Sequence, residues 1–159
     1  MGKEIERKFL VSFLPDGMSG TTMSQGYLQP EKERAVRIRA VQKDGSKKGF
    51  LTIKGIGSKS GMSRYEFETT IPVSDANHLL SLCDKPLIEK TRYKYDYEDL
   101  TWEIDEFHGD NDGLIVAEVE LESEDQQFKK PDFISEEVTG QEKYYNMMLL
   151  KNPYTTWMK

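Results

Sequence analysis

Acidic and basic side chains alternate with apolar ones in the segment EIERKFLV at residues 4–11. Glu4, Glu6 and Lys8 stand two residues apart in this segment. Side chains two apart on a strand share a face, so the spacing places two carboxylates and one ammonium in a single row. Carboxylates bind hard divalent cations, and an ammonium binds phosphate oxygens as a point charge. On its own, such a row is also compatible with a solvated strand face.

The same alternation returns in later segments, where charges of one sign again stand two residues apart. Like charges about 7 Å apart along a strand repel each other, so repeating them adds nothing to stability unless a ligand uses them. This recurrence weakens the reading of a solvated face. The later charges are Arg37, Arg39, Lys54, Arg64, Glu66, Glu68, Lys90, Arg92, Lys94, Glu103, Asp105, Glu118 and Glu120.

If the sheet closes with the charged face of each strand pointing inward, these rows become the lining of a hydrated tunnel. Charges confined in such a space need partners, and the acids would pair some of the bases. The remaining charges suit a chain of anions bridged by divalent cations. Arginine forks match phosphate oxygens, and carboxylates suit Mg²⁺ or Mn²⁺ better than Cys or His would. The pattern therefore predicts a polyphosphate-like ligand with Mg²⁺ or Mn²⁺.

The elements that must position these side chains are mostly strands, because period-two alternation is commoner along the chain than helical spacing. A helix is expected over residues 74–83. A second should begin at Thr139, which with Glu142 has capping-box spacing, and end at Asn152-Pro153; residues 122–130 are interpreted as a short acidic helix. Eight strands suffice to close a barrel without sheet edges. They are expected at 3–11, 22–29, 34–42, 48–56, 63–71, 87–98, 101–108 and 114–122.

Length, charge and cysteine content narrow the class of protein. The 159 residues fit one domain, which we expect to span residues 1–159, and the net charge of −6 argues against a nucleic-acid or anionic-membrane partner. Cys83 is the single cysteine, so no intrachain disulfide forms. With neither a signal-peptide pattern nor a membrane-length apolar run, the expected location is cytoplasmic. The outer barrel face would offer a surface for a homodimer.

The ordered motifs resemble the CYTH superfamily, also called the triphosphate tunnel metalloenzymes, and most closely its short bacterial members. The resemblance covers nearly the whole chain and rests on the series more than on any one motif. The motifs are Glu4-x-Glu6-x-Lys8, Gln25-Gly26-Tyr27-Leu28, Arg37-Ile38-Arg39, Leu51-Thr52-Ile53-Lys54-Gly55, Arg64-Tyr65-Glu66-Phe67-Glu68, Lys90-Thr91-Arg92, Trp102-Glu103-Ile104-Asp105-Glu106-Phe107, Gly113-Leu114 with Ala117-Glu118-Val119-Glu120, and Glu137-Val138-Thr139-Gly140 before Tyr145-Asn146.

The resemblance implies an α+β fold, mainly antiparallel β, with a closed eight-stranded β-barrel forming a tunnel and a few flanking helices. It also implies roles for individual residues. The tunnel would bind a small-molecule triphosphate through Lys8, Arg37, Arg39, Lys54, Lys90 and Arg92. Metal would be held by Glu4, Glu6, Glu118 and Glu120, with Asp105 as a helper, and Tyr27 paired with Lys8 would activate water for catalysis.

Several functions fit these residues. We favour metal-dependent hydrolysis of inorganic triphosphate (tripolyphosphate) to pyrophosphate and phosphate, because no aromatic pocket for an organic group is located among the inward positions. The alternatives are a class IV-type adenylate cyclase and a thiamine or nucleoside triphosphatase. A polyphosphate- or nucleotide-binding module without catalysis would not need the carboxylates. A plain barrel with a solvated charged face would show no metal-dependent stabilisation by triphosphate.

Overall fold

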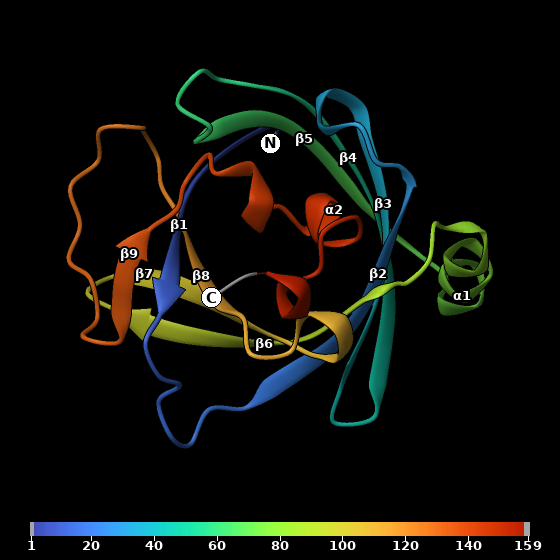
Figure 1. Cartoon of the computed structure of the whole chain (residues 1–159), viewed down its shortest axis with the longest axis horizontal. Helices are drawn as coiled ribbons and strands as arrows, with labels where there is room; N and C mark the ends of the chain where they lie inside the picture. Colours follow the sequence, from blue (N-terminus) through green and yellow to red (C-terminus); the bar gives the residue numbers. More distant parts are fainter. Residues whose placement is uncertain (1, 158–159) are drawn as a thin grey trace.

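Antiparallel strands close into a barrel in the computed structural model, which describes residues 2–157 (Figure 1). The strand order is β5-β4-β3-β2-β6-β7-β8-β1, and pairing of β1 with β5 closes the ring, while the short strand β9 extends the sheet beside β1. The eight predicted strands are confirmed; β9 was not predicted. The strands are β1 (Gly2–Val11), β2 (Gly20–Gln29), β3 (Ala35–Lys43), β4 (Ser46–Gly57), β5 (Ser63–Ile71), β6 (Ile88–Tyr97), β7 (Leu100–Phe107), β8 (Ile115–Glu120) and β9 (Ile134–Glu137).

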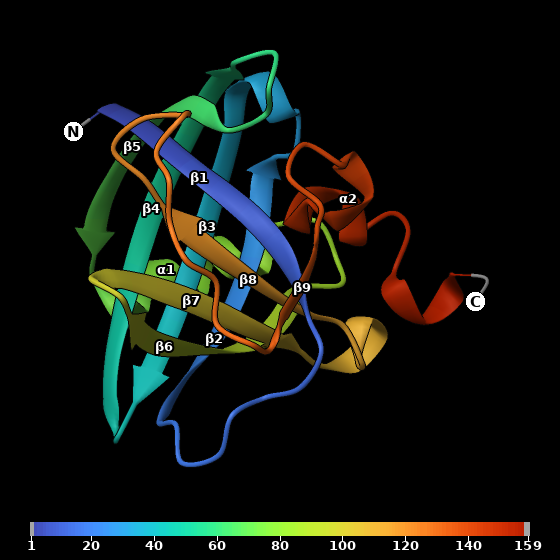
Figure 2. The same ribbon diagram turned by 90° about the vertical axis from the view of Figure 1, so that its left-hand side faces the viewer.

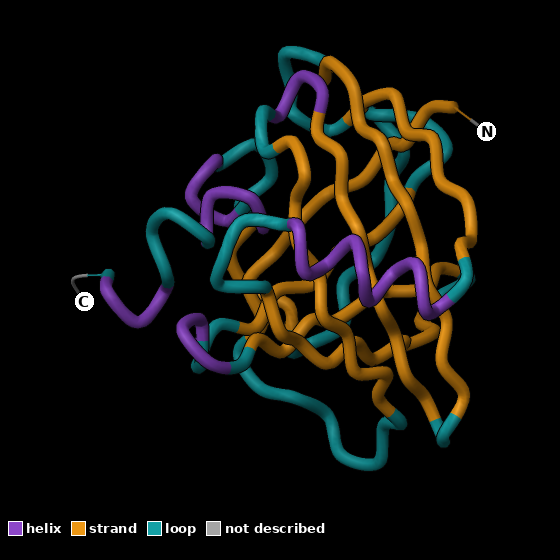
Figure 3. The backbone as a smooth tube through the Cα atoms, turned by 90° about the vertical axis from the view of Figure 1, so that its right-hand side faces the viewer, coloured by secondary structure: helices purple, strands orange, loops and turns teal. Residues whose placement is uncertain are grey.

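The outward-facing side chains of the strands form two apolar layers on the outside of the barrel. The predicted helix is present as α1 (Val73–Leu82), which lies against the outside of the strands (Figure 3). Its Ala76 and Leu80 pack with Ile38 of β3. On another side, Phe9 and Trp102 lie 5.5 Å apart between ring centroids, and the β8–β9 connection covers them. The predicted acidic helix at 122–130 is wrong, because this connection is an irregular segment whose aromatic side chains pack on the barrel.

The C-terminal segment breaks into short turns instead of the continuous helix expected from Thr139. The Thr139 hydroxyl oxygen accepts the Lys8 backbone N–H at 2.9 Å and its O–H donates to Glu137 at 2.7 Å, so it does not cap a helix. That prediction is therefore wrong. The segment contains η3 (Glu142–Tyr144), α2 (Asn146–Leu149) and η4 (Tyr154–Thr156); two further 3-10 turns are η1 (Lys32–Arg34) and η2 (Gly109–Asn111).

The inward-facing side chains change from charged to apolar at the end of the barrel that the C-terminal segment covers. Ile88, Phe107 and Val116 are each two residues from an ionisable inward position, and all are buried together with Val138 and Leu149. Figures 1 and 2 show the C-terminal segment seated over this end of the barrel. The segment thereby closes one end with an apolar cluster and leaves the charged interior on the other side of it.

No helix within residues 2–157 has the length and apolarity that a membrane crossing requires.

Candidate active site

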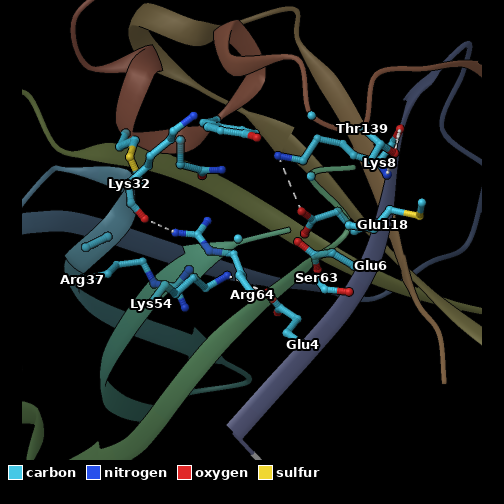
Figure 4. Close-up of a pocket in the computed structure, with 18 of the residues that line it drawn as sticks. Glu4, Glu6, Lys8, Lys32, Arg37, Lys54, Ser63, Arg64, Glu118 and Thr139 are labelled. Atoms are coloured by element: carbon cyan, nitrogen blue, oxygen red, sulfur yellow. Dashed lines mark hydrogen bonds and ion pairs between the residues drawn. The ribbon is translucent and has the colours of Figure 1, made fainter. Parts of the chain in front are cut away.

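A cavity of about 300 Å³ lies inside the barrel, and ionisable side chains from seven strands line it (Figure 4). All but two of the residues to which the resemblance gave a catalytic, phosphate-binding or metal-binding role line this cavity; Asp105 and Glu120 do not. Of the wider inward set, Glu66, Glu68, Lys94 and Glu103 are also outside the lining. The strand register explains the convergence, because Lys8 of β1 lies opposite Glu118 of β8 in the sheet. The predicted residues on the wall are Glu4, Glu6, Lys8, Tyr27, Arg37, Arg39, Lys54, Lys90, Arg92 and Glu118.

Three carboxylates from β1 and β8 form the acidic wall. Burial and the neighbouring charges of Glu118 and Glu4 raise the pKa of Glu6 well above its ordinary value. Burial also opposes ionisation of Glu118, but the charges of Lys8 and Arg92 outweigh it and lower the pKa to about 2. Protonation of Glu6 is therefore favoured beside Glu118, because two carboxylate charges there would repel each other.

Asp105 lies behind the opposite, basic wall and holds two of its cations. Lys90 Nζ donates to Asp105 Oδ2 at 2.8 Å, and Arg92 donates to both carboxylate oxygens at 2.7 and 2.9 Å. Burial opposes its ionisation, but Arg92 and Lys90 outweigh burial and hold the pKa of Asp105 far below its usual range. Glu120 is exposed at the end of β8, outside the cavity lining. Neither carboxylate therefore lines the cavity as Glu6 and Glu118 do.

The remaining wall carries two further cations, Lys54 and Arg37, which contact carboxylates at longer distances. Lys54 Nζ lies 3.1 Å from Glu4 Oε1 and 3.6 Å from Glu66 Oε2. Arg37 Nη2 donates to Thr52 Oγ1 at 3.1 Å and approaches Glu68 at 3.4 Å, while its buried Nε has no partner among the described residues. These cations retain hydrogen-bonding capacity toward a ligand.

Arg64 also lines the cavity, although the sequence placed it only in the general inward set. Its Nη2 donates to the Lys32 carbonyl oxygen at 2.7 Å (Figure 4). Its Nε is buried and has no hydrogen-bond partner within residues 2–157. A carbonyl anchor fixes the guanidinium without cancelling its charge.

Two amide side chains that sequence reasoning did not assign to the site join its cations. Gln25 Oε1 accepts from Arg39 Nε at 2.9 Å, and Asn146 Oδ1 accepts from Lys90 Nζ at 3.0 Å. The Gln25 amide nitrogen also donates to Asn146 Oδ1 at 3.0 Å. Both residues belong to motifs that supported the resemblance, Gln25-Gly26-Tyr27 and Tyr145-Asn146, and this was the only sequence signal for them.

The proposed catalytic pair, Lys8 and Tyr27, shares the cavity without a direct contact. Lys8 Nζ donates to the Tyr144 carbonyl oxygen at 3.3 Å and lies 3.6 Å from Glu118. The Tyr27 hydroxyl lies 3.5 Å from the Gln25 amide nitrogen. Lys8 Nζ instead lies 5.5 Å from the centroid of the Tyr145 ring.

The sequence of the chain matches the CYTH domain model over residues 2–148, which is most of its length. The chain belongs to the CYTH family. The resemblance drawn from the motifs is therefore confirmed, as is the barrel that it implied.

Relatives of this CYTH protein match it over nearly their full length. The curated inorganic triphosphatase of Acetivibrio thermocellus is 50% identical over 157 residues, covering 97% of each chain. That of Nitrosomonas europaea is 37% identical over 150 residues, covering 92% of this chain and 95% of the relative. A crystal structure of an inorganic triphosphatase is 36% identical with a TM-score of 0.63, covering 92% of this chain and 96% of that chain.

CYTH triphosphatases are metal-dependent, and the acidic wall of this cavity has the chemistry to hold a metal ion. Residues 2–157 contain no preformed cluster of three or more His, Cys, Asp or Glu side chains that would cage a metal. Glu6 and Glu118 nevertheless line the same cavity, and the charge of Glu118 helps to raise the pKa of Glu6. A hard cation such as Mg²⁺ is typically held by one or two carboxylates together with substrate phosphates and waters. The residues therefore fit a metal that binds with its anionic substrate.

Proposed function

We propose that this CYTH protein is an enzyme that hydrolyses inorganic triphosphate to pyrophosphate and phosphate. The observation that carries the proposal is the juxtaposition, in one small cavity, of a carboxylate pair and several cations whose charges are only partly cancelled. Relatives that match nearly the full length are named inorganic triphosphatases, which agrees with this assignment.

The cavity size supports an inorganic substrate over a nucleotide or thiamine triphosphate. Its volume of about 300 Å³ lies at the small end of the range for small-molecule sites. An additional base or thiazole ring would need apolar or aromatic space beside the triphosphate. Most of the lining is charged or polar, and these side chains suit phosphate oxygens.

The cations of the wall would bind and polarise the phosphate chain. Arginine forks and lysine ammonium groups stabilise the charge that develops on a transferring phosphoryl group, where positioning and electrostatics supply most of the catalysis. We assign this role to Lys8, Arg37, Arg39, Lys54, Lys90 and Arg92, which all line the cavity.

We assign metal binding to Glu4, Glu6 and Glu118, and we propose Mg²⁺ or Mn²⁺ because the donors are carboxylate oxygens. Bound metal would neutralise phosphate charge and polarise the attacking water. Both oxygens of Asp105 are engaged by Lys90 and Arg92, so its proposed role is to orient these cations. Glu120, which is exposed, would assist only through charge.

The reaction requires water to attack the terminal phosphorus while the bond to the bridging oxygen breaks and pyrophosphate leaves. We propose Tyr27 as the group that accepts the proton of this water, with the ammonium of Lys8 stabilising negative charge in the same cavity. Because Lys8 is held by Glu118 and by the Tyr144 carbonyl, its position is fixed before substrate binds.

Three further features belong to the proposal. A single domain over residues 1–159 is supported by Trp157, whose ring lies 5.3 Å from that of Tyr144. A cytoplasmic location is in keeping with the free thiol of Cys83.

A homodimer is proposed through the outer face of β4 and β5, where Ile53 and Phe67 are paired in the sheet and both exposed. Light scattering across a concentration series tests it.

The decisive experiment measures phosphate release from tripolyphosphate, with ATP, thiamine triphosphate and pyrophosphate as competing substrates. Activity should require Mg²⁺ or Mn²⁺ and should be lost in Glu4→Ala and Lys8→Ala. Matched controls are Glu136→Ala and Lys151→Ala, whose side chains are exposed away from the cavity. An enzyme that leaves tripolyphosphate intact and converts ATP to cyclic AMP would overturn the substrate assignment.

A further inference from the structure

Arg39 is a buried cation inside the barrel that has no ion-pair partner among the described residues. It is 8% exposed, and no carboxylate of the described residues lies within 4.0 Å of its guanidinium. Burial and the nearby charges of Arg37 and Arg92 lower the pKa of Arg39. Its hydrogen-bond partner is the side-chain oxygen of Gln25, at 2.9 Å from Nε. A neutral acceptor thus holds a buried cation whose charge has no direct counter-ion.

Lys90 also donates a hydrogen bond to a neutral side chain, the amide of Asn146. Its ammonium shares Asp105 with Arg92, so one carboxylate faces two cations. Burial and the nearby Arg39 and Arg92 outweigh the attraction of Asp105 and lower the pKa of Lys90 to about 7. Asn146 Oδ1 accepts from Lys90 Nζ at 3.0 Å and from the Gln25 amide nitrogen at 3.0 Å.

The orientation of both amides follows from the chemistry of their partners. Arginine and lysine carry only donor hydrogens, so each amide must turn its oxygen toward its cation. Gln25 then has its nitrogen free to donate to Asn146, as is observed. Gln25 is fully buried, so its side-chain amide must find its hydrogen-bond partners within the protein. The chain Arg39–Gln25–Asn146–Lys90 is therefore a satisfied network with a single consistent arrangement.

We propose that Gln25 and Asn146 are positioning residues that fix Arg39 and Lys90 for the triphosphate without cancelling their positive charge. A carboxylate at either position would hold its cation equally well but would neutralise it, and a polyanion would then bind more weakly. The proposal deepens the proposed function, on which it rests, and it assigns a role in substrate binding to a residue of the C-terminal segment. Asn146 lies in α2, so closure of the barrel end and assembly of the phosphate site are coupled.

The test compares amide-to-acid with amide-to-alanine substitutions. Gln25→Glu and Asn146→Asp keep the shape and the acceptor but add a negative charge, whereas Gln25→Ala and Asn146→Ala remove the acceptor and keep the charge of the wall. Binding of tripolyphosphate to metal-free protein is measured by titration calorimetry, with circular dichroism to confirm folding. Asn77→Asp adds the same charge on exposed α1 and is the matched control.

The order of affinities decides the outcome. Each acidic variant should weaken tripolyphosphate binding by about tenfold or more, as expected for a lost charge interaction in a confined site. Each alanine variant should weaken it less, by about threefold, and Asn77→Asp should stay within about twofold. If packing alone mattered, the isosteric acids would bind as the wild type does and the alanines would be worse; that result would overturn the proposal. If Gln25→Glu fails to fold, the Asn146 pair carries the comparison.

The binding test is independent of catalysis. A wild-type protein that hydrolyses tripolyphosphate but lacks the expected order of affinities would overturn only the role of the two amides. A wild-type protein that shows the order in metal-free binding but releases no phosphate with Mg²⁺ or Mn²⁺ would overturn the proposed function and leave the positioning role standing.

Discussion

Replacing Asp105 with asparagine removes the carboxylate behind the basic wall. Asp105 is 3% exposed and accepts hydrogen bonds from Lys90 at 2.8 Å and from Arg92 at 2.7 and 2.9 Å. Asparagine has nearly the same shape, but it turns an amide N–H₂ toward one of the cations. Breaking a buried ion pair costs about 3–5 kcal/mol, because the partner charge is left uncompensated. Arg92 keeps its ion pair with Glu103 at 3.3 Å, so we expect the free energy of unfolding to fall by about 3 kcal/mol.

Urea denaturation followed by circular dichroism measures this loss. A single domain is usually stable by about 5–15 kcal/mol, so the variant should remain folded at a lower urea midpoint. Asp99→Asn is the matched control, since Asp99 is an exposed turn residue with φ of 66°, a conformation that asparagine also adopts. Its unfolding free energy should change by less than about 0.5 kcal/mol. Equal midpoints for the two variants would refute the view that Asp105 anchors the basic wall.

The same Asp105 variant separates an orienting role from direct metal binding. If Asp105 orients Lys90 and Arg92, the KM for tripolyphosphate should rise severalfold while the Mg²⁺ concentration for half-maximal activity stays unchanged. If Asp105 is a metal ligand, the Mg²⁺ requirement should rise instead. We expect the first result, because both carboxylate oxygens already accept hydrogen bonds from cations.

Two further predictions concern the outside of the barrel. Glu137 accepts from Arg7 Nε at 2.8 Å, and this hydrogen bond lowers the pKa of Glu137. The pair therefore stabilises the protein above the ordinary glutamate pKa and loses its effect as pH falls through the lower folded-state value. The urea midpoints of wild type and Glu137→Gln should differ at about pH 7 and converge toward about pH 3. Gly26→Ala would place a Cβ 2.7 Å from Cys83 Cβ, and overpacking should cost about 1–3 kcal/mol in urea unfolding. Gly55→Ala, whose Cβ would meet Tyr65 at 3.4 Å, should cost less.

The barrel could be predicted because alternation is a local property of each strand. Arg37 and Arg39 fall on one parity and Ile38 on the other, and the structure places Ile38 under α1 while both arginines line the cavity. Strand β9 carried no such signal, since Ile134–Glu137 reads Ile-Ser-Glu-Glu. Its pairing depends on the edge that β1 presents, which no local pattern encodes.

The spacing of the carboxylates along the sequence did not predict their different positions in the structure. Glu103 and Asp105 alternate just as Glu118 and Glu120 do, yet Asp105 is buried behind two cations and Glu120 is exposed. The difference arises from the stagger between neighbouring strands, which brings Asp105 opposite Arg92 in the sheet. The C-terminal helix failed for a similar reason. The Thr139 hydroxyl and the Tyr144 carbonyl bond to Lys8 of β1, and these long-range contacts outcompete local helix capping.

The arrangement also separates the part of the protein that provides stability from the part that binds the ligand. The large apolar side chains are buried outside the barrel, as with Trp102, or in the cluster that closes one end, as with Phe107. The cavity wall can therefore keep cations such as Arg39 without a carboxylate partner, because the outer layers offset the cost of burying charge. Tripolyphosphate should accordingly raise the melting temperature of the wild type. It should raise that of Arg39→Met much less, because the methionine side chain lacks the positive charge that would bind the anion.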